Sequence, residues 1–272
     1  MKNDQLFPLP MLLRWIGKTI ALWGRRKRQI TANILSCIMI LSMLPIGDIK
    51  VLAAGEVCRI GSTGYADLQS AFNAVKEGEV IVMQSNVTIT DGTRYETKNA
   101  VNFTLDLNGK TINGGSGDWS FIMHSVAGTL TIQDSSSGSN GKITSKRSKF
   151  NCATVTTSSS SNANLILKSG TIENTYPITD AGDAGYAIIN AGGTLRIEGG
   201  KVYGTSTAIA KRGGGNMTLS GGVIEGGLYG IDTYGGSSTI TITGGSPVIK
   251  GTLKAVSLIQ IFTYSNAKIL AS

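Results

Sequence analysis

The sequence holds little of what most catalytic sites require. Its 272 residues include one histidine, His124, and no two adjacent aspartates. A Ser–His–Asp or Cys–His site would have to include His124, which lies in the strand-like segment 121–125 with no supporting motif around it. A lone histidine in a strand is usually structural or solvated. These absences count against catalysis, and the sequence predicts no catalytic residue.

Cysteine is also scarce. Cys37 lies inside an apolar stretch rather than after it, which excludes the modified cysteine of a lipoprotein. Cys58 and Cys152 would meet an oxidising environment outside the cell, where cysteines pair. Nothing in the sequence brings these two together, so a disulfide and two separate thiols both stay open.

The excess of positive charge is confined to one end of the chain. The net charge is +8, but residues 1–54 hold eight Lys or Arg and two acidic residues, which leaves 17 basic and 15 acidic residues over 55–272. The basic character therefore gives no argument for nucleic-acid binding, and no nucleic-acid partner is predicted.

Residues 1–54 have the features of an export leader. The basic run 25–28 precedes an uncharged stretch over 29–47, and the small or aliphatic residues 51–53 permit cleavage after Ala53. This order is typical of a bacterial secretory signal. The uncharged stretch is also near the length of a membrane span, so an uncleaved anchor is the alternative. Both interpretations predict an extracellular or cell-surface location, with membrane contact only through an uncleaved leader.

Downstream of the leader, a short phrase returns. Three copies, over 186–204, 207–227 and 229–251, contain an apolar stretch, glycines, a Leu-x-Ile type of stretch, a Gly pair and further apolar residues. The Leu-x-Ile stretch alternates with the period of a strand, and the glycines permit sharp bends. The first apolar residues of these stretches, taken as anchors, are Leu105, Leu130, Leu165, Leu195, Met217 and Ile240.

The spacing of the anchors predicts the architecture. The last two spacings are 22 and 23 residues, so the repeat is about 22 residues long and the earlier coils carry insertions. Three short strands and three bends per repeat predict an all-β fold, a parallel β-helix of about six coils. The 36 glycines argue against a helical solenoid, and the Asn ladder of a leucine-rich repeat is missing. A β-sandwich remains the alternative.

A helix is expected over 65–75, where Leu68, Phe72 and Val75 fall at helical spacing and Gly78 stops the helix. Placed before the first coil, this helix would cover the open end of the solenoid. The predicted organisation is a leader over 1–54, an N-terminal cap of helix and strands over 55–102, the β-helix over 103–254, and an incomplete coil or truncated end over 255–272.

The cap at 65–83, the first coil at 103–114 and the repeat of the type seen at 192–204 resemble the pectin-lyase-like superfamily, over about residues 65–250. The resemblance implies a right-handed parallel β-helix. Members include polysaccharide lyases and hydrolases, tailspikes, adhesins and many bacterial surface proteins, so the resemblance does not choose a function. Its hydrolases carry paired aspartates and a His–Gly motif, which this chain lacks, whereas a lyase needs no histidine.

Candidate carbohydrate-binding residues come from the edges of the coils. Tyr203, Tyr229 and Tyr234 would supply aromatic faces for sugar rings if stacking aligned them, and Asp232 lies on the outward side of a later coil. Scattered surface tyrosines are the alternative. A basic run at 142–149 would meet an acidic polysaccharide, or it forms a solvated loop.

Calcium is the only cofactor that the resemblance brings into question. Lyases of the superfamily usually bind calcium through clustered aspartates, and the nearest candidates are Asp180 and Asp183, with Asp232 on a later coil. Hard cations need several converging oxygens, and two aspartates in a Gly-containing loop are more often turn formers. The sequence therefore predicts no metal and no cofactor, with calcium as the minor alternative.

Together these features predict an exported bacterial cell-surface or secreted β-helix protein. Its expected role is non-catalytic binding of a polysaccharide, a surface glycan or another surface partner. The alternative is a polysaccharide lyase or glycoside hydrolase of the pectin-lyase-like superfamily, complete or truncated. The oligomeric state is not predicted.

Overall fold

The computed structural model describes residues 55–159, 162–179, 183–213, 215–234, 239–257, 262–264 and 268–271. The chain divides into two compact units, 1–51 and 52–272, and all described residues belong to the second. The leader over 1–54 lies outside the described residues. Within the described part, no helix is long and apolar enough to cross a membrane.

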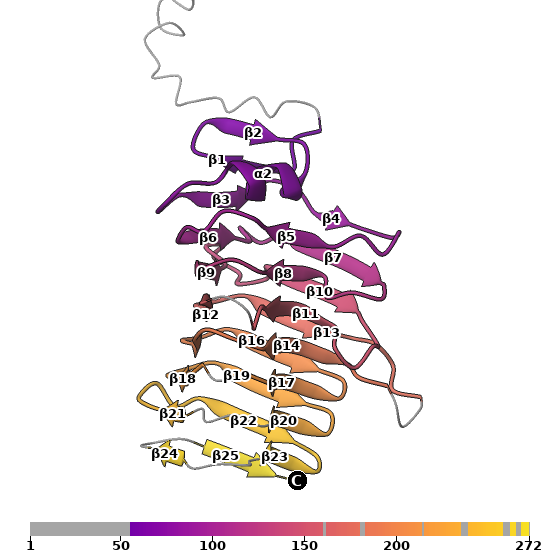
Figure 1. Cartoon of the computed structure of the whole chain (residues 1–272), viewed down its shortest axis with the longest axis vertical. Helices are drawn as coiled ribbons and strands as arrows, with labels where there is room; N and C mark the ends of the chain where they lie inside the picture. The colour runs from indigo at the N-terminus through magenta and orange to yellow at the C-terminus, as the bar shows by residue number, and fades with distance from the viewer. Residues whose placement is uncertain are drawn as a thin grey trace, which may run out of the picture. The chain divides into compact units, whose positions relative to one another are not determined.

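The second unit is a parallel β-helix built from three sheets, each of which receives one strand from every complete coil (Figure 1). Sheet A contains, in parallel order, β3 (Val80–Met83), β6 (Phe103–Asp106), β9 (Gly128–Gln133), β12 (Ala163–Leu167), β15 (Leu195–Ile197), β18 (Met217–Leu219), β21 (Ile240–Ile242) and β24 (Phe262–Tyr264). Sheet B contains β4 (Val87–Thr88), β7 (Thr111–Ser116), β10 (Lys142–Lys146), β13 (Thr171–Asn174), β16 (Lys201–Gly204), β19 (Val223–Gly226), β22 (Val248–Gly251) and β25 (Lys268–Ala271). Sheet C contains β5 (Tyr95–Thr97), β8 (Ile122–His124), β11 (Ala153–Thr157), β14 (Tyr186–Asn190), β17 (Thr207–Lys211), β20 (Tyr229–Thr233) and β23 (Lys254–Ser257).

The prediction of an all-β parallel solenoid is therefore confirmed, and the ladder is longer than the repeat phrase suggested. Parallel pairing starts at β3, where Ile81 lies opposite Leu105. It continues through β23 to β24 and β25. Seven coils are complete among the described strands, and an eighth contributes two strands. The sequence analysis placed this first coil in the cap, because Val80–Met83 is a continuous apolar run without the Leu-x-Ile alternation of the repeat.

The register confirms most of the predicted anchors and corrects one. Leu130, Leu165 and Leu195 pair in succession, followed by Met217 and Ile240. In the coil before them, Phe103 rather than Leu105 lies opposite Leu130. The segment 103–107 alternates apolar and polar residues throughout, so a shift of two residues preserves the inward pattern and only the ladder decides the register.

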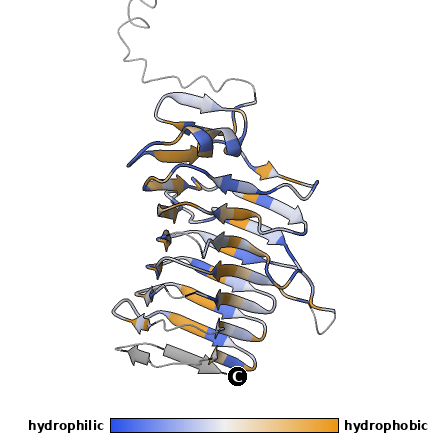
Figure 2. Ribbon diagram, viewed as in Figure 1, coloured by the Kyte–Doolittle hydropathy of each residue, from blue (hydrophilic) through white to orange (hydrophobic). Residues whose placement is uncertain are grey.

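Inward side chains stack into one continuous apolar core. Along sheet A the buried positions alternate with partly exposed ones, as in β12 and β18. Leu165, Leu195 and Met217 are fully buried in successive coils. Figure 2 shows this arrangement as hydrophobic bands that repeat from coil to coil. Each rung therefore buries its apolar side chains mainly against the rungs on either side.

A short helix begins the cap, α2 (Leu68–Ala74). The Asp67 side chain accepts a hydrogen bond from the backbone N–H of Ser70 at 2.8 Å and so caps the first turn. The ring of Phe72 packs against Tyr95 and Phe103, with centroids 6.3 and 5.9 Å away. The helix ends at Ala74, with the next residue extended. The prediction that Gly78 stops it was wrong, because the chain leaves the helical conformation before that glycine.

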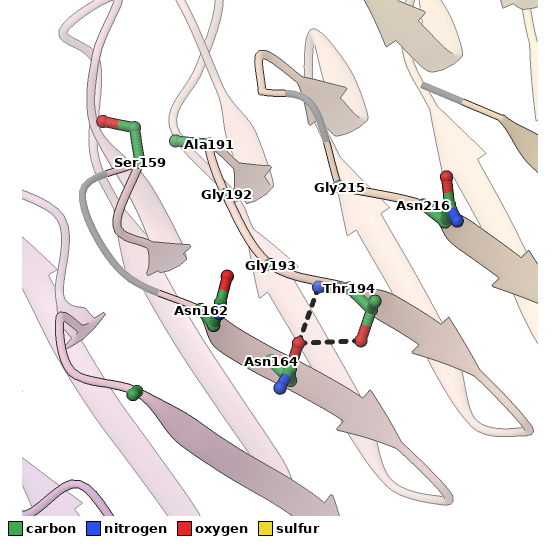
Figure 3. Close-up of a pocket in the computed structure, with 10 residues that line it drawn as sticks. Ser159, Asn162, Asn164, Ala191, Gly192, Gly193, Thr194, Gly215 and Asn216 are labelled. Atoms are coloured by element: carbon green, nitrogen blue, oxygen red, sulfur yellow. Dashed lines mark hydrogen bonds between the residues drawn. The ribbon is translucent and has the colours of Figure 1, made fainter. Parts of the chain in front are cut away.

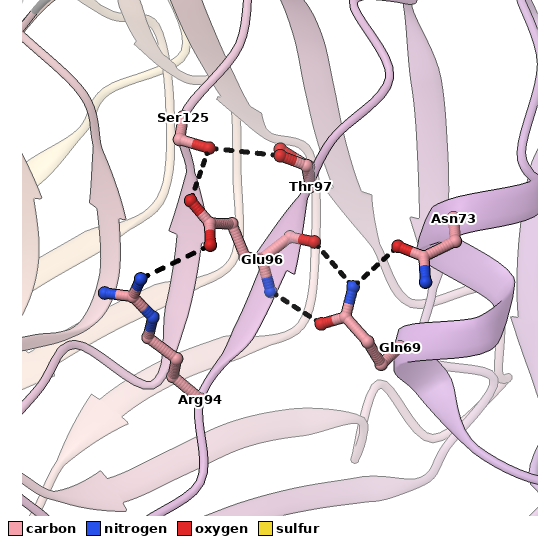
Figure 4. A network of polar contacts seen from close by, with 6 residues as sticks. All are labelled: Gln69, Asn73, Arg94, Glu96, Thr97 and Ser125. Carbon is pink, nitrogen blue, oxygen red and sulfur yellow. Dashed lines mark hydrogen bonds and ion pairs between the residues drawn. The ribbon is translucent and has the colours of Figure 1, made fainter.

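The cap closes two of the sheet edges at this end. The hairpin of β1 (Cys58–Ile60) and β2 (Thr63–Tyr65) pairs antiparallel with β3. On sheet C a side chain replaces a strand: the Gln69 carboxamide accepts from Glu96 N and donates to Glu96 O, both at 2.8 Å (Figure 4). These contacts satisfy backbone groups of the terminal coil that would otherwise be unpaired.

Cys58 and Cys152 do not form a disulfide. Cys58 and Cys152 are both buried and free. The Cys152 thiol lies 3.0 Å from the carbonyl oxygen of Asp118, and burial raises the pKa of Cys58 to about 12. The sequence left open either a disulfide or two separate thiols, and the structure shows two separate thiols.

A polar column, buried except at the partly exposed Thr233, runs along the carboxyl ends of the sheet C strands. Its members lie opposite one another in successive coils and are Thr97, His124, Thr157, Asn190, Lys211 and Thr233. His124 Nε2 donates to the carbonyl oxygen of Gly128 at 3.1 Å, so Nδ1 accepts from the Thr97 hydroxyl at 2.7 Å. The histidine is structural, which matches its lack of a catalytic motif.

His124 makes the stability of the fold depend on pH. Burial lowers its pKa, although the hydrogen bond to Gly128 opposes this effect. The unfolded chain takes up a proton at about pH 6.5 while the native histidine stays neutral. We therefore expect the contribution of neutral His124 to the free energy of unfolding to be complete above about pH 6.5. This contribution should be lost as the pH falls toward the lowered pKa of the native histidine.

The expected result is a lower urea midpoint at about pH 5.5 than at about pH 7.5 for the unaltered chain. His124→Gln keeps a polar group in the column and should show a smaller difference between the two midpoints. Equal pH dependence of the two proteins would contradict this assignment.

Candidate functional site

The described part of the chain contains an open groove of about 920 Å³ where sheet C connects to sheet A (Figure 3). The turns that follow β8, β11, β14 and β17 stack to form it. Neighbouring coils are about 4.8 Å apart, so contributions from four coils extend about 14 Å along the solenoid. The groove is lined by Ala127, Ser159, Asn162, Asn164, Ala191, Gly192, Gly193, Thr194, Gly215 and Asn216.

The lining is polar without being charged. Amide, hydroxyl and backbone groups make up its polar surface, and none of the lining residues is acidic or basic. Asn164 Oδ1 accepts from both the backbone N–H and the hydroxyl of Thr194, at 2.8 and 2.9 Å (Figure 3). Between the next two coils, the backbone N–H of Thr239 donates to Asn216 Oδ1 at 3.5 Å. These contacts tie each of the two asparagine side chains to the residue that follows it in the next coil.

Glycines let the stacked turns approach closely. Gly193 has a φ of +65°, and a Cβ at this position would lie 2.2 Å from the carbonyl oxygen of Ala163. The polar column holds the same wall from inside, because Gly192 O accepts from Thr157 Oγ1 and Asn190 Nδ2. At Gly192 and Gly193 the groove wall is therefore backbone surface that is held in place from inside.

An aromatic cluster with a central arginine lies beside the groove, on the outer face of sheet C. The Arg212 guanidinium lies 4.1, 4.9 and 5.2 Å from the ring centroids of Phe150, Tyr186 and Tyr234. Its Nη1 donates to the Asn151 side chain. Phe150 is 53% exposed and Tyr234 is 39% exposed, so two of the rings present surface to solvent.

The aromatic cluster packs on a small set of buried apolar residues that also reaches the groove. Ala153, Tyr186, Ile189 and Ala210 form a separate buried cluster on this face, against which Ala191 packs. Ala191 also lines the groove. The insertions before β11 and β14 cover part of this face, so Phe150 and Ala184 reach it from those loops.

Asp232 and Tyr234 lie in this cluster. Burial raises the pKa of Tyr234, and its hydrogen bonds to Asp232 and Tyr186 act in the same direction. Asp232 is itself mostly buried. The phenol is therefore held as a neutral donor beside a carboxylate, an arrangement suited to positioning and hydrogen bonding.

The structure separates the remaining predicted residues. Tyr229 lies opposite Thr207, which lies opposite Tyr186, so it belongs to the same column of sheet C two coils away. Tyr203 lies on sheet B, where Lys201 Nζ is 5.3 Å from its ring centroid. The four predicted residues thus do not form a single platform, and only Asp232 and Tyr234 belong to the cluster with Arg212.

The sequence reasoning missed the polar residues of the groove. A usable signal was present, because a Thr or Asn stands directly before the first apolar residue of the sheet A strand in successive coils. These residues are Thr129, Asn164, Thr194, Asn216 and Thr239. Phe150 and Arg212 had no comparable periodicity, because an insertion brings Phe150 to the arginine.

The two candidate calcium ligands that the structure describes, Asp183 and Asp232, do not gather into a metal site. Asp183 accepts hydrogen bonds from the backbone N–H and hydroxyl of Thr179, at 2.9 and 3.1 Å, within its own loop. Asp180 lies outside the described residues, and Asp232 hydrogen-bonds to Tyr234. Where the structure is described, no three His, Cys, Asp or Glu side chains gather to hold a metal ion.

The basic run at 142–149 does not form one surface. Arg147 is fully buried, and its guanidinium donates to the carbonyl oxygens of Gly92, Thr93 and Gly114. Lys142 pairs with Glu173 at 3.0 Å on sheet B. Arg147 therefore links the early coils from inside, and the interpretation of the run as a solvated loop or a docking patch was wrong for this residue. Lys142 lies on strand β10 with a partly exposed side chain.

Comparisons with protein-family models, with curated proteins and with solved structures gave no match.

Proposed function

We propose that this protein binds a polysaccharide or surface glycan along the groove between sheets C and A. The observation that carries the proposal is the lining of that groove, which offers amides, hydroxyls and backbone groups without charge over four coils. Many neutral donors and acceptors in a row match the hydroxyl groups of a polymer of sugars. Its open, elongated form also suits a chain better than an enclosed small molecule.

The adjoining aromatic cluster supports the same ligand class. Exposed aromatic faces pack against the C–H faces of sugar rings while polar tips remain free to hydrogen-bond. Phe150 and Tyr234 supply such faces. The neutral Tyr234 hydroxyl beside Asp232 adds a directional contact at the edge of the groove.

The proposal includes the cellular location and the superfamily membership expected from the sequence. The protein would act outside the cytoplasm, as a secreted or surface-attached bacterial β-helix. Membership of the pectin-lyase-like superfamily, with a right-handed coil, is part of this proposal. A right-handed crossover is the usual choice for parallel strands in one sheet.

Binding to a panel of immobilised neutral and acidic polysaccharides tests the proposal. We expect Tyr234→Ala to weaken binding about tenfold, because an aromatic contact contributes on the order of 1 kcal/mol. Trp119→Ala is the matched control, since Trp119 is 63% exposed but belongs to neither the groove nor the cluster. No binding by the folded chain, or equal losses in both variants, would overturn the proposal.

The same incubations separate binding from catalysis. New oligosaccharides released into solution would instead support the alternative, a polysaccharide lyase or glycoside hydrolase. Unsaturated ends on those products would identify a lyase.

A further inference from the structure

A buried lysine lies in the polar column without an opposing charge. Lys211 is the last residue of β17 and is fully buried. Its Nζ donates to Asn190 Oδ1 at 3.1 Å and to the carbonyl oxygen of Gly213 at 2.8 Å. Among the described residues it forms no ion pair with a carboxylate. Its column neighbours, Asn190 and Thr233, carry only amide and hydroxyl groups.

An ammonium group in this position is unfavourable. Removing a charge from water without a paired counter-charge costs more than two hydrogen bonds to neutral acceptors return. Burial accordingly lowers the pKa of Lys211 to about 8. Part of the population is then a neutral amine at neutral pH, and a neutral, desolvated amine is a nucleophile.

The neighbouring group is an electrophile held in place. Asn190 lies directly opposite Lys211 on the adjacent strand and is also fully buried. Its Nδ2 donates to Thr157 Oγ1 at 3.0 Å and to Gly192 O at 2.9 Å. Both ends of the Asn190 carboxamide are therefore fixed. Lys211 Nζ contacts its carbonyl oxygen, and its Nδ2 contacts the Thr157 hydroxyl.

We propose that Lys211 and Asn190 join in an intramolecular amide cross-link between adjacent coils. The neutral Nζ attacks Cγ of Asn190, a bond between Nζ and Cγ forms, and the bond between Cγ and Nδ2 breaks. One proton passes from Nζ to the departing nitrogen, which leaves as ammonia. No electrons are gained or lost, and no co-reactant is needed.

Three features of the site favour this reaction. Nucleophile and carbonyl are in hydrogen-bond contact, so the cost of bringing them together is already met by folding. Burial keeps water from competing as the nucleophile. The Thr157 hydroxyl accepts a hydrogen bond from the departing nitrogen and donates to Gly192 O, so the leaving group is held in a fixed orientation. The product is a neutral amide, which removes the uncompensated charge.

The cross-link is independent of the proposed glycan binding, but it lies behind the groove. Gly192 lines the groove, and Gly213 lies two residues before Gly215, which lines it in the next coil. A covalent rung between β14 and β17 would hold these two turns at a fixed separation. It would also resist separation of the coils under mechanical load outside the cell.

Peptide mapping of the purified full chain tests the proposal. Cleavage after Lys and Arg would release Ser169–Arg196 and Val202–Lys211 as linear peptides if no bond exists. We expect a branched species instead, Ser169–Arg196 joined to Val202–Arg212. Its mass should be one ammonia less than the sum of the two, because modified Lys211 is not cleaved. Fragmentation should place the bond at Asn190 and Lys211.

Recovery of the two linear peptides with an intact Asn190 amide would overturn the proposal. Lys211→Arg is the control, because a guanidinium keeps the charge but is not nucleophilic, and only linear peptides should result. The decisive measurement is made on the unaltered chain, so it stands even if this variant does not fold.

Discussion

Leu195→Asp is expected to unfold the β-helix at temperatures where the unaltered chain is folded. Leu195 is fully buried in β15, between Leu165 and Met217 of the adjacent coils. The substitution removes an apolar side chain and places a carboxylate in the core without a partner. A loss above about 4 kcal/mol is expected, which is a large part of the total stability of a typical domain. Circular dichroism during thermal unfolding measures it.

The neighbouring residue provides the control. Arg196 points outward from the same strand and is exposed, and it pairs with Glu198 at 2.7 Å. Exposed ion pairs contribute little, so Arg196→Gln should shift the unfolding free energy by less than about 1 kcal/mol. An unchanged melting curve for Leu195→Asp would mean that Leu195 does not face the core.

Gly226→Ala is expected to have the second largest effect. A Cβ at Gly226 would lie 1.7 Å from the carbonyl oxygen of Tyr229, across the two-residue turn that joins sheets B and C. A backbone atom at that distance cannot be avoided by a rotamer change, so the turn would have to open. We expect a loss of about 3 kcal/mol or more, measured by urea unfolding.

Gly138→Ala separates this effect from the general cost of replacing a glycine. Its nearest atom would be Nδ2 of Asn140 at 2.6 Å, the end of a flexible side chain on an exposed loop. The expected change is within about 0.5 kcal/mol. Similar losses in the two variants would show that the turn after β19 does not pack as tightly as described.

The same turn explains why one register position of sheet B holds glycine in some coils and not in others. Gly204, Gly226 and Gly251 lie opposite one another, and each is followed by a two-residue connection to sheet C. In earlier coils that position holds Asn174 and Ser145, where longer insertions follow. Glycine is required only where the connection is short, because the next strand then passes directly over the position.

The local sequence pattern was sufficient to predict the parts of the fold that repeat. The alternation of Leu195, Arg196 and Ile197, together with the glycines on either side, predicted a short strand, and its recurrence predicted the stack. The cap helix followed from the spacing of Leu68 and Phe72, although its end at Ala74 did not. The pairing of Phe103 with Leu130 could not be predicted from the sequence, because a shift of two residues leaves an alternating pattern unchanged.

The candidate site is predictable to a smaller extent. Tyr234 was identified from its position near a coil edge and Asp232 from its place on the outward side of a later coil. The structure adds Arg212 and the rings that make Tyr234 part of a cluster. Phe150 reaches Arg212 from an insertion 62 residues earlier in the chain. No periodicity connects those two positions, because the contact depends on how the insertion folds back onto the sheet.

The sequence by itself determined that the chain builds a stack of short parallel strands, because that property repeats and each copy needs only its neighbours. The tertiary structure alone decided which side chains meet across coils: the asparagines of the groove, the arginine among its aromatic rings, and Lys211 against Asn190. The physical reason is that these contacts form between residues 20 or more positions apart. Their geometry depends on the register and on the length of every turn between them, and local alternation fixes neither.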